Sequence, residues 1–448
     1  MKWRTWPAWA FLGALLWVRL RLRRPLRARQ RVLLASSLLA LVLVGCATSS
    51  GGGSNGGAAG LLDAAGAAGS SAGQGGASTG NNAGNAGNAG NAGESAGTSG
   101  GGVAGQPGVA EAGMAGEAAG GTAGVVELAA WHLYGRWHVV DAKRAVTVNS
   151  GSHITTSFLG SGIAARFDVS GNTGSMPTVA WKIDDGDWKE AEISASLSLA
   201  QGLTVGTHRL TLFVRGMNET DPRWSPPLVA STVFLGFDVS GGSLQPTARP
   251  HRLRLEFLGD SITEGVRVHS AGPSGQTSNN WLADARLAYP SVTAGALDAE
   301  WRQVGFGRQG LTVVANGGVP KAQESFDWIY SGVPRDDWQP DIVVINEGTN
   351  DRGSTAKAFG PLYGQYLDLI RNAYPKAMLV ALEPFVGAFG TEISAQVEKR
   401  RAAGDLHLVY VDTTGWTGPS DFTDGLHPNA AGSQVVRAHL EPVLRGLN

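Results

Sequence analysis

The sequence predicts an antiparallel β-sandwich followed by an α/β domain with a parallel sheet. Polar and apolar residues alternate in short runs from about residue 126 to residue 242, which is typical of half-buried antiparallel strands. From Arg252 onward, apolar runs alternate instead with amphipathic helical stretches, which indicates a parallel sheet covered by helices on both faces. A serine, Ser261, stands directly after the first of these runs, so we expect a reactive group at a strand-to-helix turn.

The predicted sandwich spans residues 126–248 and is of jelly-roll kind. Its runs, such as 153–158, 163–167 and 178–183, are separated by Gly, Asn, Asp and Ser, and residues 184–187 predict a hairpin turn. We interpret its tryptophans as packing residues of the sheets, with one or two on a sugar-binding surface as the alternative. These are Trp131, Trp137, Trp181, Trp188 and Trp224.

The predicted α/β domain spans residues 249–448. We expect strands over residues 253–258, 303–306, 341–346, 377–382 and 407–411, and helices over 281–297, 356–373, 391–403 and 429–447. Because sites in such folds gather at the carboxyl ends of the strands, residues that follow these runs are the candidates for chemistry.

Residues 1–45 predict an export signal. Nine Lys or Arg and no acid lie between Met1 and Arg31, and a short apolar run follows, too short for a comfortable membrane span. Its end, Leu43-Val44-Gly45-Cys46, resembles a bacterial lipobox, which implies lipidation of Cys46; an ordinary signal peptide is the alternative. Cys46 is the only cysteine, so the mature chain has no internal disulfide. We therefore expect an exported lipoprotein of the cell envelope, at the outer membrane or cell surface, held to the membrane by an N-terminal lipid.

Residues 46–125 predict a disordered tether. They consist almost wholly of Gly, Ala, Ser, Asn and Thr, and such a segment cannot bury enough apolar surface to offset its chain entropy. Without the nine N-terminal cations the chain has 27 basic and 37 acidic residues, a net charge of −10. This balance argues against a nucleic-acid partner, which would need a basic face.

The segment Gly259-Asp260-Ser261-Ile262 carries the candidate nucleophile. The free backbone N–H groups at a helix start can stabilise developing negative charge beside the Ser261 hydroxyl. We expect Asp260 and Gly259 to support this loop rather than to react. An ordinary N-cap is the alternative, because Asp and Ser both cap helices.

Two further segments follow predicted strands. The Gly305–Gly310 turn allows close backbone approach, and Gly310 could donate its N–H to an oxyanion. Asn350, in Gly348-Thr349-Asn350-Asp351, offers a neutral amide donor of the type used in oxyanion holes. A plain loop and a helix cap are the respective alternatives.

The fourth segment, residues 424–429, precedes the last predicted helix. Asp424 stands three residues before His427, a spacing that lets the carboxylate reach the imidazole while the other ring nitrogen takes the serine proton. His251 is the fallback base. His132, His138, His153 and His208 fall in the sandwich and are expected to be structural, and His439 to be a surface or packing residue.

At these four segments the chain resembles the SGNH (GDSL-like) hydrolases, whose motifs carry Ser, Gly, Asn and His in this order. Ser261, Gly310, Asn350 and His427 match them, and Asp424 matches the acid of the family's Asp-x-x-His. The resemblance covers about the last 200 residues and implies a flavodoxin-like three-layer α/β/α domain. The preceding sandwich also resembles carbohydrate esterase family 2, which removes acetyl groups from polysaccharides. Two departures are the Gly-Arg-Gln-Gly of the second motif and Leu426, where that family often has an aromatic.

Together these features predict a serine esterase that uses neither metal nor cofactor and acts on an acylated carbohydrate or a small ester. Ser261 would attack the acyl carbonyl, and the Ser261 N–H, the Gly310 N–H and the Asn350 amide would hold the oxyanion. The alternatives are a lipase-like or thioesterase activity, or a glycan-binding lipoprotein with a vestigial hydrolase domain. The Gly-x-Ser-x-Gly elbow of α/β-hydrolases occurs only in the predicted tether, where it reflects composition.

Overall fold

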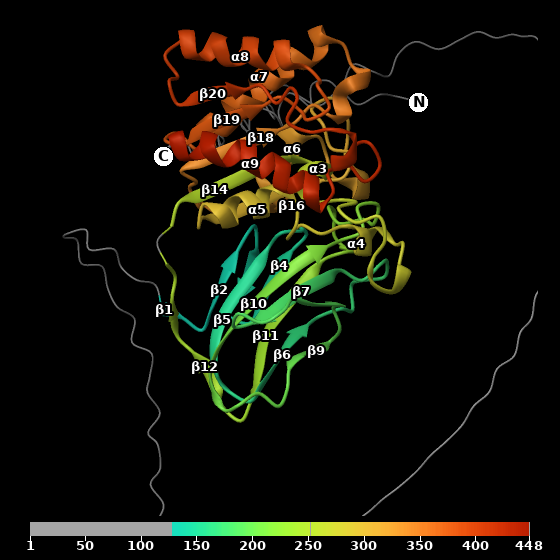
Figure 1. The fold of residues 1–448 in the computed structure, drawn as a ribbon, viewed down its shortest axis with the longest axis vertical. Helices are drawn as coiled ribbons and strands as arrows, with labels where there is room; N and C mark the ends of the chain where they lie inside the picture. The colour runs from blue at the N-terminus through green and yellow to red at the C-terminus, as the bar shows by residue number, and fades with distance from the viewer. Residues whose placement is uncertain (1–127, 251, 448) are drawn as a thin grey trace, which may run out of the picture. The chain divides into compact units, whose positions relative to one another are not determined.

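The computed structural model describes residues 128–250 and 252–447 (Figure 1). The predicted export signal, the whole of the predicted tether with Cys46, and His251 lie outside the described residues. The described residues all belong to one compact unit. Among the helices of the described part, none is long and apolar enough to cross a membrane.

An antiparallel, strand-rich region comes first, as predicted. Its strands are β1 (Leu128–Ala129), β2 (Trp131–Tyr134), β3 (His138–Asp141), β4 (Arg144–Thr147), β5 (His153–Gly160), β6 (Gly162–Phe167), β7 (Thr178–Ile183), β8 (Lys189–Glu192), β9 (Ser196–Ala200), β10 (Gly206–Gly216), β11 (Thr232–Ser240), β12 (Ser243–Gln245) and β13 (Thr247–Ala248). One sheet has the order β12-β5-β10-β7-β8, with β2 also on β5, and a second has the order β3-β4-β11-β6-β9. A core that includes Phe158, Trp181 and Phe234 draws its side chains from both sheets. The hairpin predicted at residues 184–187 is confirmed, because β7 and β8 pair antiparallel around it.

The parallel sheet that follows has the order β15-β14-β18-β19-β20, so the first strand in sequence lies second in the sheet. Every pair along this order is parallel. The strands are β14 (Arg254–Asp260), β15 (Glu300–Phe306), β18 (Ile342–Asn346), β19 (Met378–Leu382) and β20 (Leu408–Val411), beside a small hairpin of β16 (Trp328–Tyr330) and β17 (Val333–Pro334). Each of the five predicted strands is therefore present, with shifts of one to a few residues at its ends.

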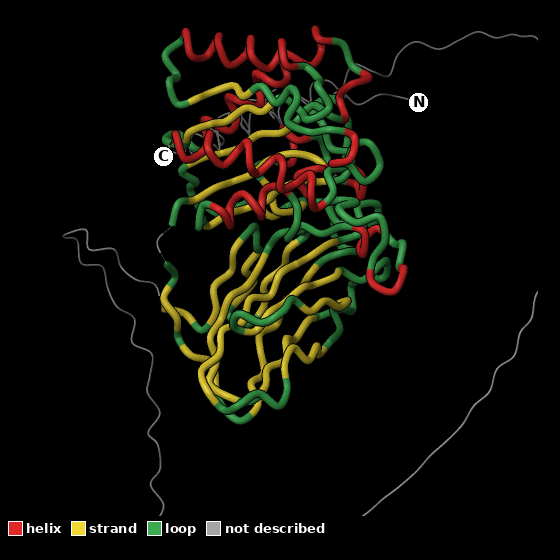
Figure 2. Tube along the Cα trace, viewed as in Figure 1, coloured by secondary structure: helices red, strands yellow, loops and turns green. Residues whose placement is uncertain are grey.

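Helices flank the strands of this sheet (Figure 2). They are α3 (Ser261–Glu264), α4 (Asn279–Leu282), α5 (Tyr289–Ala296), α6 (Ala322–Ser325), α7 (Ala356–Ala373), α8 (Gly390–Ala402) and α9 (Ala430–Leu447), with 3-10 turns η1 (Pro273–Gly275), η2 (Asn316–Gly318), η3 (Asn350–Gly353) and η4 (Pro419–Asp421). Alternate side chains of the sheet join two different cores. Val343 and Ile345 pack with α7 and α8, whereas Ile342 and Val344 pack with α5 and α9. This alternation is the pattern expected of a sheet buried on both faces.

The helix predicted over residues 281–297 is wrong as a single element. The structure breaks it into α4 and α5, with residues 283–288 in between. Pro290 lies in the first turn of α5, where a missing N–H is tolerated, and a proline prevents the upstream helix from continuing through this point. The intervening segment places the buried Asp284 against Arg215 of β10, at 3.3 Å.

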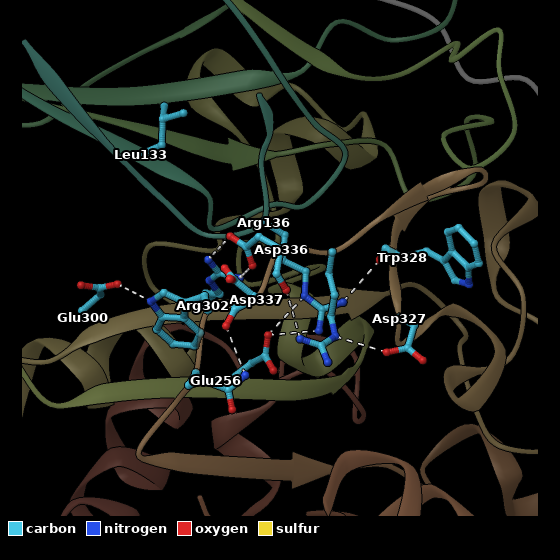
Figure 3. Close-up of polar contacts among 12 residues, drawn as sticks. Leu133, Arg136, Glu256, Glu300, Arg302, Asp327, Trp328, Asp336 and Asp337 are labelled. Carbon is cyan, nitrogen blue, oxygen red and sulfur yellow. Dashed lines mark hydrogen bonds and ion pairs between the residues drawn. The ribbon is translucent and has the colours of Figure 1, made fainter. Parts of the chain in front are cut away.

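Buried ion pairs join the strand-rich region to the parallel sheet. Arg223, from the loop after β10, donates to both carboxylate oxygens of Glu264, and both side chains are fully buried. Arg136 donates to Glu256 of β14 at 3.1 Å and to the Phe326 carbonyl at 2.7 Å (Figure 3). Charges removed from water are stable only when they are closely paired. These contacts therefore fix the interface between the strand-rich region and the parallel sheet, which we call the seam.

We expect the Arg223→Met substitution to lower the free energy of unfolding by about 3–5 kcal/mol, because it leaves the Glu264 carboxylate buried without its partner. Urea denaturation of the purified protein measures this loss. The matched control is Arg209→Met, which removes an exposed pair with Asp185 (side chains 73% and 93% exposed) and should cost less than about 1 kcal/mol. Equal losses in the two variants would show that the buried pair does not hold the seam.

Candidate active site

The predicted nucleophile lies at a strand-to-helix turn at the carboxyl end of β14. Asp260 ends the strand with an extended backbone, and Ser261 begins α3. The Asp260 carboxylate accepts the Ile262 N–H at 2.9 Å, so it caps the helix as its sequence position suggested. Gly259 has no room for a side chain, because a Cβ there would lie 2.6 Å from the Asn346 carbonyl oxygen. The turn is thus held tightly, and the Ser261 side chain is almost fully buried.

Ser261, His427 and Asp424 form a continuous hydrogen-bonded chain. His427 Nε2 lies 2.9 Å from Ser261 Oγ, and His427 Nδ1 lies 2.9 Å from Asp424 Oδ2. A carboxylate can only accept, so Nδ1 carries the ring proton and Nε2 is left to accept from the serine hydroxyl. Partial burial raises the pKa of Asp424, but hydrogen bonds from the His427 N–H and imidazole outweigh it and hold the pKa below its usual value. Asp424 therefore stays charged and fixes this tautomer.

A short turn before α9 positions His427. The Asp424 carboxylate also accepts the backbone N–H groups of Leu426 and His427, at 3.1 and 2.9 Å. The Thr423 N–H donates to the His427 carbonyl at 2.9 Å. These local bonds mean that the three-residue spacing alone sets the imidazole orientation. Arg267 approaches the same carboxylate, with its Nε 3.8 Å from Asp424 Oδ2.

Asn350 lies beside the nucleophile turn and links it to the second motif. Its amide donates to Asp260 Oδ2 at 3.2 Å and to the Gln309 carbonyl at 2.8 Å. The first, second and third motifs are thus in contact, as their places after neighbouring strands suggested. Both of these hydrogen bonds are to protein oxygens, so the amide that is expected to face a substrate is engaged by the protein in this structure.

The Gly310 N–H, which is predicted to donate to an oxyanion, has a protein partner in this structure. It donates to the Val313 carbonyl at 3.1 Å, because the turn after β15 closes on itself. Asp351 holds this turn by accepting the N–H groups of Leu311 and Thr312, at 3.1 and 2.6 Å. A Cβ at residue 310 would lie 2.6 Å from Asp351 Oδ2, so the close approach of this carboxylate requires glycine.

Acidic groups are buried beneath the serine. Burial raises the pKa of Asp260 to about 6, although the Ile262 N–H and the charge of His427 act in the opposite direction. Glu347 is fully buried, and neither of its oxygens has a hydrogen-bond partner among the described residues. Burial, with the nearby charges of Asp260 and Asp351, raises the pKa of Glu347 well above its usual value and so favours its neutral form.

The four histidines of the sandwich and His439 make packing or structural contacts. In the sandwich, His153 stacks on Tyr134, and burial lowers its pKa to about 4. His208 pairs with Asp184 at 2.8 Å. His132 and His138 contact the Thr247 carbonyl and the Tyr330 hydroxyl, and His439 stacks on Trp416. Their expected structural roles agree with these contacts.

A cleft of about 540 Å³ lies near the amino ends of the strands, away from Ser261. Trp131, Arg254 and Trp338 are among its lining residues. The charges around it are largely paired with one another: Arg302 forks the Asp336 carboxylate at 2.5 and 2.6 Å and lies 4.2 Å over the Trp338 ring. Figure 3 shows this cluster beside Arg136. Trp137, Trp181 and Trp224 are buried, as expected of packing residues.

The sequence did not identify two residues that hold the motifs in place, Glu264 and Arg223. Glu264, three residues after the serine, accepts from Arg223 and also from the Gly307 N–H at 2.8 Å. Its place in the first motif was a possible signal. Arg223 carried none, because its partner is 41 residues away in another part of the fold.

Comparison with known proteins gives the family of the second region. Residues 257–435 match the model of the GDSL-like Lipase/Acylhydrolase family. This match confirms the resemblance to SGNH hydrolases and identifies this part of the chain as a carboxylic ester hydrolase domain.

Two curated relatives extend the similarity into the strand-rich region. The chain is 26% identical over 329 residues to cellulase/esterase CelE of Acetivibrio thermocellus, covering 68% of this chain and 38% of CelE. It thus spans well under half the length of that relative. It is 25% identical over 331 residues to an acetylxylan esterase / glucomannan deacetylase of Cellvibrio japonicus, covering 69% of this chain and 87% of that protein.

A solved structure shares the fold of both regions. It is a family two carbohydrate esterase from Clostridium thermocellum in complex with cellohexaose, with a TM-score of 0.61 and 23% identity. The match covers 70% of this chain and 98% of that structure, so it extends through the sandwich as well as the parallel sheet. The resemblance of the two-region architecture to carbohydrate esterase family 2 is therefore confirmed.

We expect Asp260→Asn to stabilise the protein more at pH 8 than at pH 4. The folded-state pKa of about 6 lies above the ordinary value of 3.8, so the wild type loses stability as the pH rises through this window. Asparagine does not titrate and still caps α3. Thermal unfolding measures the effect, since 1 kcal/mol of stability shifts the melting temperature by roughly 2–4 °C or less in a unit of this size.

The control for this experiment is Asp187→Asn, which makes the same change at an exposed turn of the strand-rich region. Its melting-temperature difference from the wild type should be the same at both pH values. A pH-independent difference for Asp260→Asn would contradict the raised pKa of the buried carboxyl.

Proposed function

We propose that the protein is a serine esterase that removes acetyl groups from a polysaccharide or oligosaccharide. The observation that carries this proposal is the chain from Ser261 through His427 to Asp424, with both hydrogen bonds at 2.9 Å. The serine, the base and its orienting carboxylate have the mutual geometry that nucleophilic acyl transfer needs.

The reaction then follows the logic of a Ser-His-Asp triad. His427 Nε2 takes the Ser261 proton as the serine oxygen bonds to the acyl carbon. His427 returns the proton to the leaving alcohol when the ester bond breaks, and the acyl group remains on Ser261. Water, activated by His427, then releases the carboxylic acid and restores the serine hydroxyl. Asp424 stabilises the imidazolium that forms in each step without taking the proton.

The oxyanion hole in this proposal consists of the Ser261 N–H, the Gly310 N–H and the Asn350 amide. Asn350 lies next to the nucleophile turn, through its contact with Asp260, which supports its place in the hole. The Gly310 N–H would have to turn from the Val313 carbonyl toward the substrate oxygen. Such tightening of catalytic hydrogen bonds on substrate binding is common in hydrolases.

Similarity to carbohydrate-active relatives supports a carbohydrate acetyl ester as the substrate. One curated relative is an acetylxylan esterase / glucomannan deacetylase that aligns with 69% of this chain, and a structure with the same fold holds cellohexaose. A lipase-like or thioesterase activity is the alternative within the family. A glycan-binding protein with a vestigial hydrolase domain is the alternative outside it, and the assembled triad argues against that.

The finer architecture and the location belong to the same proposal. Two packed antiparallel sheets support a jelly-roll sandwich, and the sheet order with helices on both faces supports a flavodoxin-like three-layer α/β/α domain. The lipobox-like sequence at Cys46 supports an exported lipoprotein that presents the esterase from the cell envelope.

We expect Ser261→Ala and His427→Ala each to reduce kcat by about 10⁴-fold or more, and the double variant to lose little beyond that, because the two residues act as a unit. Hydrolysis of p-nitrophenyl acetate measures this, with the exposed Ser420→Ala as a control of unchanged activity. Robust ester cleavage by Ser261→Ala would rule out the proposed nucleophile.

The wild type is expected to release acetate from acetylated xylan or glucomannan oligosaccharides, detected by mass spectrometry. Activity on p-nitrophenyl esters should fall from acetate to butyrate to octanoate, since a pocket sized for acetyl excludes longer chains sterically. Preference for octanoate would favour the lipase-like alternative. Glycan binding with no hydrolysis of any ester would favour a glycan-binding protein with a vestigial hydrolase domain.

A further inference from the structure

The loop between β10 and β11 brings an acidic residue of the sandwich, Glu219, to the active site. The loop is anchored by Arg223, which pairs with Glu264 of the nucleophile turn and donates its N–H to the Gly317 carbonyl at 3.1 Å. Both anchors belong to segments that follow strands of the parallel sheet. The position of Glu219 relative to Ser261 is therefore set by buried contacts.

Glu219 lies directly against the second motif. A Cβ on Gly307 would lie 2.7 Å from Glu219 Cβ and 2.8 Å from its carboxyl carbon, and it would overlap the carboxylate oxygen Oε2. Gly307 stands three residues before Gly310, and its N–H is held by Glu264 at 2.8 Å. The glycine thus makes room for a carboxyl group at the edge of the turn that leads to the proposed oxyanion hole.

The Glu219 carboxyl interacts with several nearby charges, including that of His427. Burial and the negative charge of Glu264 raise its pKa, whereas the charges of His427 and Arg223 and a hydrogen bond from Asn316 lower it. The side chain keeps some solvent exposure, unlike Glu264, which is fully buried. Since a carboxylate has about four acceptor positions, the partly exposed Glu219 carboxylate can accept further hydrogen bonds.

We propose that Glu219 is a specificity-determining residue that accepts hydrogen bonds from sugar hydroxyls next to the scissile ester. This inference rests on the proposed function and concerns how the alcohol portion of the ester substrate is recognised. His427 delivers its proton to the leaving alcohol, so a carboxyl that lies against Gly307 and interacts with the charge of His427 is suited to contact that alcohol. Vicinal hydroxyls on a sugar can both donate to one carboxylate, and such charge-assisted bonds are short and strong.

The test compares two substrates in Glu219→Gln, which keeps the size of the side chain against Gly307. For acetylated xylo-oligosaccharides, kcat/KM should fall about 10- to 100-fold, the effect of losing a hydrogen bond to a charged group. For p-nitrophenyl acetate, whose alcohol has no hydroxyl to donate, kcat/KM should change less than about twofold. Asp185→Asn, the same change on an exposed turn of the sandwich, should alter neither.

Two results would overturn the inference. Unchanged kcat/KM on the saccharide would show that Glu219 does not contact the sugar. An equal fall on both esters would show that Glu219 acts on the turn at Gly307 or on His427, rather than on the alcohol. The wild-type protein tests the proposed function separately from the role of Glu219. If it hydrolyses p-nitrophenyl acetate but releases no acetate from any acetylated saccharide, the carbohydrate assignment itself is refuted.

Discussion

The geometry of the active site depends on the buried Glu264 carboxylate. Glu264 lies in the turn that carries the serine, and it accepts from Arg223 of the sandwich and from Gly307 of the second motif. One fully buried anion thus connects three segments from distant parts of the chain. Because an unpaired charge would be very costly there, the three segments can form only together. The sandwich is in this sense part of the hydrolase structure and not merely attached to it.

The parallel sheet explains why the motifs meet. β14 lies between β15 and β18, so the turns after these strands converge at one edge of the sheet. Asn350 then contacts both Asp260 and Gln309, and Asp351 holds the turn at Gly310. His427 arrives from the segment after β20 and needs only its local bonds to Asp424 for orientation. The strand order brings the motifs together at one edge of the sheet, and short hydrogen bonds orient their side chains.

Features set by local sequence could be predicted, and those set by distant contacts could not. Apolar runs located the five parallel strands, and the spacing of Asp424 and His427 predicted the hydrogen bond between them, because each pattern lies within a few residues. Helix α5 was missed as a separate element although Pro290 marked its start. The engagement of the Gly310 N–H by Val313 depends on how one turn closes, which residue types do not determine. The seam residues Arg136 and Arg223 were invisible, since their partners lie 120 and 41 residues away.

The buried acids beneath the serine have a physical consequence for the proposed chemistry. Asp260 accepts a backbone N–H next to Ser261, Asp351 accepts one in the turn after β15, and burial favours the neutral form of Glu347. The charge of His427 acts to lower the pKa of Asp260, so the two groups interact favourably when Asp260 is ionised and His427 becomes positive in the proposed acyl transfer. The field at this edge of the sheet therefore favours the imidazolium, and it does so before any substrate binds, as electrostatic preorganisation requires.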